Sequence, residues 1–551
     1  MIQDSVNKNL AQARSVISGD EILQHIEQLA SDDFAGRSPS TIGEEKTLDY
    51  FDAYFTGLNS ALNSAGDSAV NSGVNSGVNS GANSGANLRS AAKFKTIRQN
   101  VPAVEIHSKF NCSMTVKGQP FPLVAPQQYV VSSRRTQDKI DIKNSAIIFV
   151  GYGIKATEYG WDDFKDIDVT GKTIVVLAGD PILNQRDNPA LVDTTMFRGK
   201  ELTYYGRWTY KFETAGLRKA AAVLIVHETA RAGYGWDVVT HSFGHEHFDL
   251  QSTDQSTIPA VEGWMSVETA RQLFEKCGAD YEALKALASS QDFHPVPLDA
   301  KFQASLTSEF KKVESKNFIA ILPGADDQLA DECVVYTAHW DHFGVTADGV
   351  MSGAMDNASG VAGVLALAKA FAYSENRPPR SVVFLIPTLE EQNLLGSRYY
   401  VENPEFDIKK TLAVLNLEIL NVWGPSKAVS SVCKGHSTLD ELMAESAHRQ
   451  GRVVVAEPQP EKGYLYRSDH VPFMQAGIPG LALFFPGMDL LDRRQQYITT
   501  DYHKVSDKVK PDWDLSGTVD DVLLFFDIGM RILETGYRAT WNVMSEFMRR
   551  S

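Results

Sequence analysis

Side chains that can bind metal ions or move protons occur in five short segments of the second half of the chain. Imidazoles and carboxylates are metal ligands, and carboxylates also act as general acids and bases. The side chains are His339, Asp341 and His342 in AHWDHFG, Asp356 in GAMDNASG, Glu390 and Glu391 in PTLEEQ, Glu418 in LNLEI, and Tyr502, His503 and Asp507 in TTDYHKVSD. If the fold brings these segments together, they predict a metal-binding or acid–base site.

The elements that must position these segments alternate between strand-like and helix-like patterns from about residue 314 onward. Strand-like runs cover 333–340, 381–388, 411–420 and 480–486, and helix-like runs cover 359–374, 437–450 and 516–536. Strands that alternate with helices predict an α/β fold, with a mostly parallel central sheet and helices on both faces. In such sheets functional residues lie at the carboxyl ends of the strands. The polar segments occur at those ends.

Each polar segment taken alone has a simpler explanation. A histidine after a strand is usually a hydrogen-bonded residue, a pair of glutamates is usually solvated, and Asp356 could simply cap a helix. Glu390 and Glu391, however, directly follow the apolar run 381–387, where a buried strand must emerge. The simpler explanations do not predict several potential ligands at one edge of one sheet.

The segments resemble the motifs of the co-catalytic di-zinc exopeptidases of the aminopeptidase Y and glutamate carboxypeptidase type. AHWDHFG is similar to their first ligand motif, GAMDNASGVAG to their bridging-aspartate motif and EEQNLLGS to their paired-glutamate motif. The resemblance covers roughly 315–540 with all motifs in order, and the stretch 30–51 is similar to the N-terminal part of these enzymes. It implies a zinc exopeptidase fold.

Residue by residue, the resemblance implies two zinc ions. His339 and Glu418 are expected to bind one ion, Glu391 and His503 the other, and Asp356 both. Two zinc ions carry four positive charges, which three carboxylates and a bridging hydroxide balance. A fourth carboxylate is therefore not needed as a ligand. This leaves Glu390 as the expected general base, acting on a water whose pKa the metals lower.

The resemblance also suggests supporting residues. Asp341, two residues beyond His339, is expected to hold that imidazole. Tyr502 is a candidate donor to the tetrahedral oxyanion, or else a packed loop aromatic. In the segment 464–480, Arg467, Ser468 and Asp469 are expected to bind substrate or support the site, and for Asp469 a structural role is the alternative.

Two positions depart from the family pattern. The family more often has Asp where this chain has Glu418, and Asp where it has Met355. Glu418 still offers a carboxylate, although its extra methylene can change the geometry or the metal preference. Met355 is a neighbour of the bridging residue and is not expected to ligate.

The expected activity is removal of N-terminal residues from peptides. A free α-amine is a cation, and Glu390 and Glu418 can compensate its desolvation. A carboxypeptidase would need cations around the substrate carboxylate, and only Arg467, Lys462 and Lys504 lie near the motifs. Carboxypeptidase activity stays the main alternative. A non-catalytic receptor-like relative and a glutaminyl cyclase, which uses one zinc, are further alternatives.

Three parts are expected along the chain. Residues 1–125 form the N-terminal helical part of the peptidase domain, and they include an Asn/Ser/Gly repeat at 70–87 that is expected to be a flexible surface insertion. Residues 126–292 resemble the protease-associated domain, a β-rich module inserted into some peptidases. Residues 293–551 form the zinc peptidase domain.

Composition limits the partners. The chain has 551 residues and a formal charge of −16, so it has no global electrostatic reason to bind nucleic acid or anionic lipid. Its longest apolar runs, such as 381–389, reach about half of the ~18 residues that a membrane span requires. Four cysteines are too few for a disulfide framework. The first residues lack the apolar segment of a signal peptide, and secreted or periplasmic localisation is expected from the family resemblance alone.

Overall fold

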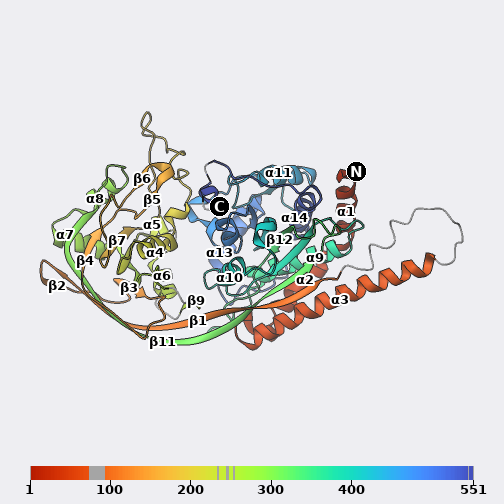
Figure 1. Ribbon diagram of the computed structural model, residues 1–551, viewed down its shortest axis with the longest axis horizontal. Helices are drawn as coiled ribbons and strands as arrows, with labels where there is room; N and C mark the ends of the chain where they lie inside the picture. Colours follow the sequence, from red (N-terminus) through yellow and green to blue (C-terminus); the bar gives the residue numbers. More distant parts are fainter. Residues whose placement is uncertain are drawn as a thin grey trace. The chain divides into compact units, whose positions relative to one another are not determined.

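The computed structural model describes residues 2–73, 93–232, 235–243, 247–251, 255–543 and 545–549. It divides into two compact units, and Figure 1 labels many of their elements. Unit 1 comprises Met1–Val101, Glu314–Pro458 and Tyr464–Ser551, and unit 2 comprises Pro102–Val313 and Gln459–Gly463. The predicted repeat at 70–87 lies outside the described residues from residue 74 onward, and its first four residues end a helix.

Unit 1 contains a mostly parallel sheet. Its strands lie in the order β19 (Gly480–Phe484), β16 (Thr411–Glu418), β12 (Cys333–Thr337), β15 (Ser381–Ile386) and the end of β11 (Val296–Leu322). The first four are mutually parallel, whereas β11 is antiparallel to β15. Every residue of those four strands is buried, as expected for apolar strands covered on both faces. The predicted α/β fold class is confirmed.

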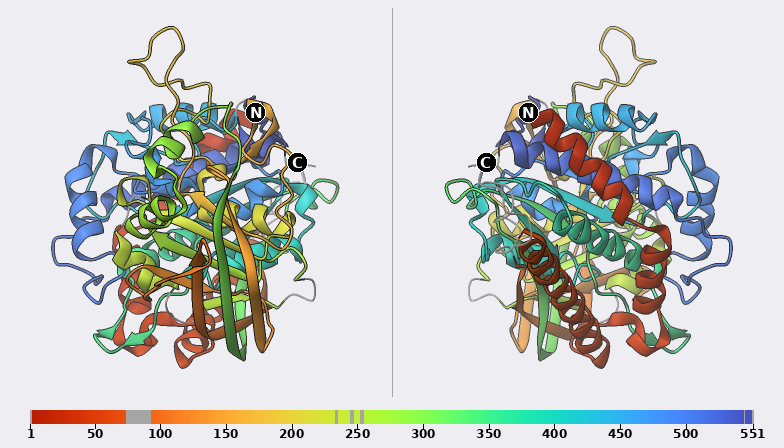
Figure 2. Two further views of the ribbon diagram at one scale, coloured as in Figure 1. Left: turned by 90° about the vertical axis from the view of Figure 1, so that its left-hand side faces the viewer. Right: turned by 90° about the vertical axis from the view of Figure 1, so that its right-hand side faces the viewer.

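Helices cover both faces of this sheet. On one face, Val335 and Val383 pack in a cluster with Phe473 of α12 (His470–Gln475). Neighbouring residues of a strand point to opposite faces, and on the other face Tyr336 and Phe384 contact Phe371 of α9 (Ser359–Ala372). α9 packs against α14 (Ser516–Thr535), along which α1 (Ile2–Val16) lies, red beside blue in Figure 2.

The other elements of unit 1 surround this core. They are α2 (Gly19–Leu29), α3 (Ile42–Gly73), α10 (Leu395–Glu402), α11 (Leu439–Arg449), α13 (Leu491–Thr500), and the short strands β13 (Val345–Thr346), β14 (Gly349–Val350), β17 (Ala428–Val429) and β18 (Val453–Val454). α3 contributes Phe51 and Phe55, whose rings lie against Phe318 of β11. In the part of the chain that the structure describes, no helix is long and apolar enough to cross a bilayer.

Unit 2 has its own parallel strands. β4 (Lys139–Phe149), β7 (Thr173–Leu177), β8 (Ala222–His227) and β10 (Val261–Ser266) are parallel, and β3 (Tyr129–Ser132) is antiparallel to β10. Its other elements are α4 (Trp208–Leu217), α5 (Thr229–Ala232), α6 (Trp236–Phe243), α7 (Val267–Cys277), α8 (Tyr281–Ala288), β2 (Gln119–Phe121), β5 (Lys155–Ala156), β6 (Trp161–Asp162) and β9 (His247–Leu250). The resemblance to a protease-associated domain stays a prediction.

The boundaries between the units differ from those expected at 125/126 and 292/293. The chain passes from unit 1 to unit 2 within β1 (Lys95–Val116) and returns within β11. Both boundaries therefore fall inside continuous strands, between Val101 and Pro102 and between Val313 and Glu314.

Candidate metal centre

The carboxyl ends of three neighbouring strands supply most of the predicted site. His339 follows β12, Glu390 and Glu391 follow β15, and Glu418 is the last residue of β16. Since β12 pairs with β15 on one side and with β16 on the other, these ends meet at one edge of the sheet. Asp356 reaches the same place from the turn before α9.

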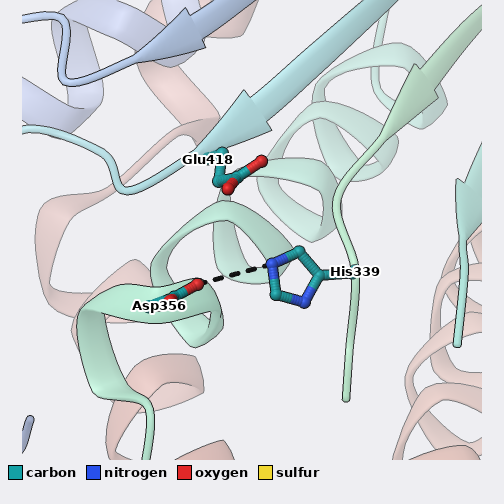
Figure 3. Close-up of side chains that lie close together, drawn as sticks. All are labelled: His339, Asp356 and Glu418. Atoms are coloured by element: carbon teal, nitrogen blue, oxygen red, sulfur yellow. Dashed lines mark ion pairs between the residues drawn. The ribbon is translucent and has the colours of Figure 1, made fainter. Parts of the chain in front are cut away.

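Asp356 lies between two imidazoles. Its Oδ1 is 3.4 Å from Nε2 of His339, and its Oδ2 is 3.1 Å from Nε2 of His503. Potential ligand atoms of His339, Asp356 and Glu418 all lie within 4.8 Å of one another, and Figure 3 shows the three side chains facing a common point. A carboxylate with one oxygen toward each imidazole has the arrangement that a bridging ligand requires.

Glu391 completes the other side of the cluster. Its Oε2 lies 3.2 Å from Nε2 of His503, and its Oε1 lies 2.7 Å from Nδ1 of His342. His342, Asp356 and Glu391 form a second group whose potential ligand atoms lie within 4.8 Å of one another. His342 was visible in AHWDHFG, but its distance in sequence from Glu391 left its role unassigned.

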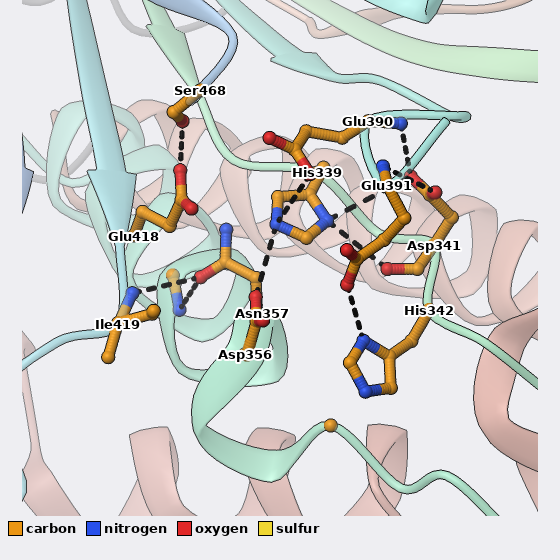
Figure 4. A network of polar contacts seen from close by, with 12 residues as sticks. His339, Asp341, His342, Asp356, Asn357, Glu390, Glu391, Glu418, Ile419 and Ser468 are labelled. Carbon is orange, nitrogen blue, oxygen red and sulfur yellow. Dashed lines mark hydrogen bonds and ion pairs between the residues drawn. The ribbon is translucent and has the colours of Figure 1, made fainter. Parts of the chain in front are cut away.

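Asp341 acts on the glutamates more directly than on His339. Its Oδ1 lies 3.9 Å from Nδ1 of His339, whose nearer neighbour is the Asp341 carbonyl oxygen at 3.1 Å. The carboxylate instead accepts hydrogen bonds from the backbone N–H groups of Glu390, at 3.1 Å, and Glu391, at 3.4 Å. Asp341 thus joins the loop after β12 to the loop after β15 (Figure 4).

Glu390 lies at the edge of the cluster, and its carboxylate forms a further group with His339 and Glu391 whose potential ligand atoms lie within 4.8 Å of one another. Its Oε2 is 3.8 Å from Nε2 of His339, and the side chain is buried. Burial raises the pKa of Glu390 well above its usual value, and the neighbouring carboxylates Glu418 and Glu391 raise it further while His339 opposes them.

The three residues expected to bind substrate or support the site lie in different surroundings. Ser468 is buried and donates a hydrogen bond to Oε2 of Glu418, so it holds the carboxylate of a candidate ligand in place. Asn416 donates to the same Ser468 oxygen at 2.6 Å. Asp469 is fully buried, which raises its pKa to about 6. The guanidinium of Arg467 lies 5.0 Å from the ring centre of Tyr464.

Tyr502 lies directly against a candidate ligand. Its ring stacks on His503, with 3.9 Å between the ring centres and 23° between the planes. Burial, together with Asp356 and Glu391, raises the pKa of the Tyr502 phenol well above 10. The hydroxyl therefore keeps its proton and stays a hydrogen-bond donor at neutral pH.

Two further residues stabilise the turn that contains Asp356 by hydrogen bonds to backbone N–H groups. Asp507 accepts hydrogen bonds from the backbone N–H groups of Met355, at 3.0 Å, and Asp356, at 3.1 Å. Asn357 accepts from the N–H groups of Gly360 and Ile419, and so joins this turn to the end of β16. Asp507 was part of the segment TTDYHKVSD, whereas nothing in the sequence indicated the role of Asn357 beyond its place in the motif.

Arg37, in the N-terminal part of the chain, forms hydrogen bonds with the loops that carry the site residues. Its buried guanidinium donates hydrogen bonds to the carbonyl oxygens of Leu29, Trp340, Ser352 and Gly353, at 2.7 to 2.9 Å. Burial lowers its pKa to about 10, so it stays charged. It therefore holds the loop of His339 and the turn of Asp356 at a fixed separation.

The electrostatics of the cluster fit bound cations. Burial raises the pKa of Glu418 to about 8, with a contribution from Asp356. Partial desolvation lowers the pKa of His503, whose side chain is 36% exposed, yet Glu391 and Asp356 raise it to about 10. The Nε2 atom of His339 is buried without a hydrogen bond to any described residue. Without metal ions, protons on these groups balance the negative charge of the carboxylates. Bound cations would replace those protons. Imidazole nitrogens and carboxylate oxygens are also ligands that zinc prefers.

Comparisons with known proteins find a match to a peptidase family over the part of the chain that contains the motifs. Residues 317–526 match the sequence model of peptidase family M28. Leupeptin-inactivating enzyme 1 of Streptomyces exfoliatus is 32% identical over 169 residues, which are 30% of this chain and 35% of that protein. The match thus spans about a third of the relative's length.

Solved structures of similar proteins include two aminopeptidases. The aminopeptidase from Aneurinibacillus sp. strain AM-1 has a TM-score of 0.49 and 16% identity, with 95% of this chain and 96% of that chain covered. BSAP, a zinc aminopeptidase from Bacillus subtilis, has a TM-score of 0.44 and 16% identity, with 95% and 97% covered. The matched range 317–526 contains all five expected metal ligands. It is the sequence match that identifies residues 317–526 as a peptidase family M28 domain.

Proposed function

We propose that this chain is an aminopeptidase that removes N-terminal residues from peptides at a centre of two zinc ions. The observation that carries the proposal is Asp356 between His339 and His503, one carboxylate oxygen toward each imidazole. His339 and Glu418 would hold one ion, Glu391 and His503 the other, and Asp356 both. Bound zinc would polarise the scissile carbonyl and lower the pKa of the attacking water.

Glu390 would move the proton. Its carboxyl lies at the edge of the cluster, 3.8 Å from His339, and the charge balance does not require it as a ligand. It would accept the proton of the attacking water and then deliver it to the leaving amine. A raised pKa suits both steps, because a general acid–base is most effective when its pKa lies near the working pH.

Tyr502 would stabilise the oxygen of the scissile carbonyl. The ring is fixed by stacking on His503, and the protonated hydroxyl can donate a hydrogen bond to the negative charge that develops there. Ser468 and Asn416 would keep the carboxylate of Glu418 in place, since the Ser468 hydroxyl donates to its Oε2 and the Asn416 amide donates to the same Oε2 at 3.4 Å and to Ser468 at 2.6 Å.

The charges around the cluster favour a cationic substrate terminus. Glu390, Glu418 and Asp356 are all buried, and Glu390 is not required to balance the metal ions. The cationic α-amine of a peptide would offset the negative charge of the carboxylate that the metal ions do not balance, whereas a substrate carboxylate would add a second negative charge. This supports cleavage from the N-terminus.

The direction of cleavage is tested with one peptide in three forms. The free peptide and its C-amidated form should both lose their first residue, and the N-acetylated form should not be cleaved, because it lacks the cationic amine. Mass spectrometry of the products shows which end is lost. Cleavage of the acetylated peptide but not of the amidated one would make the chain a carboxypeptidase. Loss of ammonia from an N-terminal glutamine without cleavage would indicate a glutaminyl cyclase.

Zinc uptake by the metal-free protein should release protons at pH 7. With pKa values near 10 for His503 and near 8 for Glu418, and a value well above 6.5 for His339, each group is protonated in the metal-free protein. Each must lose its proton to ligate. Up to three protons are therefore released, and zinc affinity should rise as the pH rises from 6 to about 8.

Calorimetry in buffers of different ionisation enthalpy gives the number of protons released. Glu418→Gln is the matched control: it removes one protonated group and one ligand of the zinc shared with His339, so it should bind that zinc more weakly and release fewer protons than the wild type. Zinc binding with no proton release, and with an affinity independent of pH, would show that these groups are not the ligands.

A further inference from the structure

We propose that His342 is a positioning residue that selects which oxygen of Glu391 binds zinc. Its Nδ1–H donates to Oε1 of Glu391 at 2.7 Å, which leaves Oε2 for the ion shared with His503. The inference deepens the proposed function. It depends on the metal centre of that proposal but not on the direction of peptide cleavage.

The two oxygens of Glu391 have different surroundings, as Figure 4 shows for Oε1 and His342. Oε2 lies 3.2 Å from Nε2 of His503, the same nitrogen that is 3.1 Å from Asp356. A carboxylate that is free to rotate could present either oxygen to a metal, or both. A hydrogen bond to one oxygen removes that freedom and keeps Glu391 a ligand through one atom.

The position of His342 is fixed independently of Glu391. Its backbone N–H donates to the carbonyl oxygen of Arg37 at 3.2 Å. Its side chain is fully buried, and its ring packs edge-on against Phe343 and His503, with ring centres 4.9 and 6.0 Å away. The donor is therefore in place before a metal binds.

The same loop would thus serve both zinc ions. His339 would bind one ion directly, and His342, three residues later, would orient a ligand of the other. His342 has a second nitrogen, Nε2, which is buried and makes no hydrogen bond to the described residues. Direct ligation of zinc by His342 is consequently the competing role that the experiment must separate.

Three variants separate the two roles: His342→Ala, His342→Asn and His342→Gln. The amide nitrogen of Asn can occupy the place of Nδ1, and that of Gln the place of Nε2. Zinc affinities of both sites are measured by titrating the metal-free proteins against a competing chelator. His342→Ala should weaken one zinc by about 10–100-fold and leave the other unchanged. His342→Asn should restore most of the loss, and His342→Gln should not.

X-ray absorption of the zinc-loaded proteins gives a second measurement. His342→Ala should keep the number of imidazole ligands found in the wild type, because His342 orients a ligand without being one. Loss of an imidazole, rescue by Gln but not by Asn, or unchanged affinity in His342→Ala would each overturn the inference. If His342→Ala does not fold, the zinc affinities of His342→Asn and His342→Gln still show whether His342 orients Glu391 or binds zinc itself.

The outcomes also separate this inference from the proposed activity. A wild type that binds two zinc ions but cleaves no peptide would contradict the aminopeptidase proposal, while the affinities of the variants would still decide the role of His342. A wild type that binds no zinc would overturn both.

Discussion

Replacing Glu390 with Gln should lower kcat by about 10²–10⁴-fold while both zinc ions stay bound. Gln keeps the size and shape of the side chain but cannot accept a proton. The Glu390 carboxyl lies 3.8 Å from the imidazole of His339, and the five expected ligands hold both zinc ions in the proposed centre without it. Zinc content by mass spectrometry and turnover of a peptide substrate are measured on the same preparation.

Glu391→Gln is the matched control for that prediction. Glu391 and Glu390 are neighbours in sequence, but Oε2 of Glu391 lies 3.2 Å from His503 within the cluster. The control variant should therefore lose affinity for one zinc, and with it activity. If Glu390→Gln lost metal and Glu391→Gln kept it, the two roles would have to be exchanged.

The site residues at the ends of the strands could be predicted, because each one directly follows an apolar run in the sequence. Apolar runs followed at once by His339, Glu390 or Glu418 mark buried strands that emerge at one edge of a parallel sheet. The order of the strands was not needed for this prediction, because any parallel arrangement brings these ends to the same side.

The residues that support the ligands could not be predicted, because their contacts join distant parts of the chain. Arg37 reaches a carbonyl oxygen 303 residues away, at Trp340, and 49 residues separate His342 from Glu391. Ser468 lies in the segment 464–480, which suggested either substrate contact or support of the site, and the sequence did not show that its hydroxyl is directed at Glu418. Side-chain types alone do not show which of many possible partners a polar group meets.

The backbone conformation at the site could not be predicted from the sequence either. Leu389, Ile419 and His503 have φ values of 54°, 51° and 56°, in the left-handed region that such side chains rarely adopt. Each costs on the order of 1–3 kcal/mol, and the surrounding structure must offset it. Leu389 precedes Glu390 and Ile419 follows Glu418, so two of these three residues turn the chain after strands of the sheet, and His503 lies in the loop after α13. One compensating contact is the hydrogen bond from the Ile419 N–H to Asn357.

Asp356→Ala should remove both zinc ions, whereas His339→Ala and His503→Ala should each remove one. In the proposed centre each ion has three protein ligands, and Asp356 is the only residue in both sets. Without it each ion keeps two ligands, fewer than the three protein ligands that catalytic zinc sites use. His339→Ala leaves the ion held by Asp356, Glu391 and His503 complete.

Zinc per chain after dialysis against a chelator distinguishes these cases. We expect close to none for Asp356→Ala, with turnover below that of Glu390→Gln, and close to one for each histidine variant. Asp356→Asn, which keeps the shape of the side chain and one oxygen, controls for a general loss of structure. It should retain more zinc than Asp356→Ala at equal thermal stability. One firmly held zinc in Asp356→Ala would show that this carboxylate serves a single metal. The position of Asp356 between two imidazoles would then have to be explained by hydrogen bonding alone.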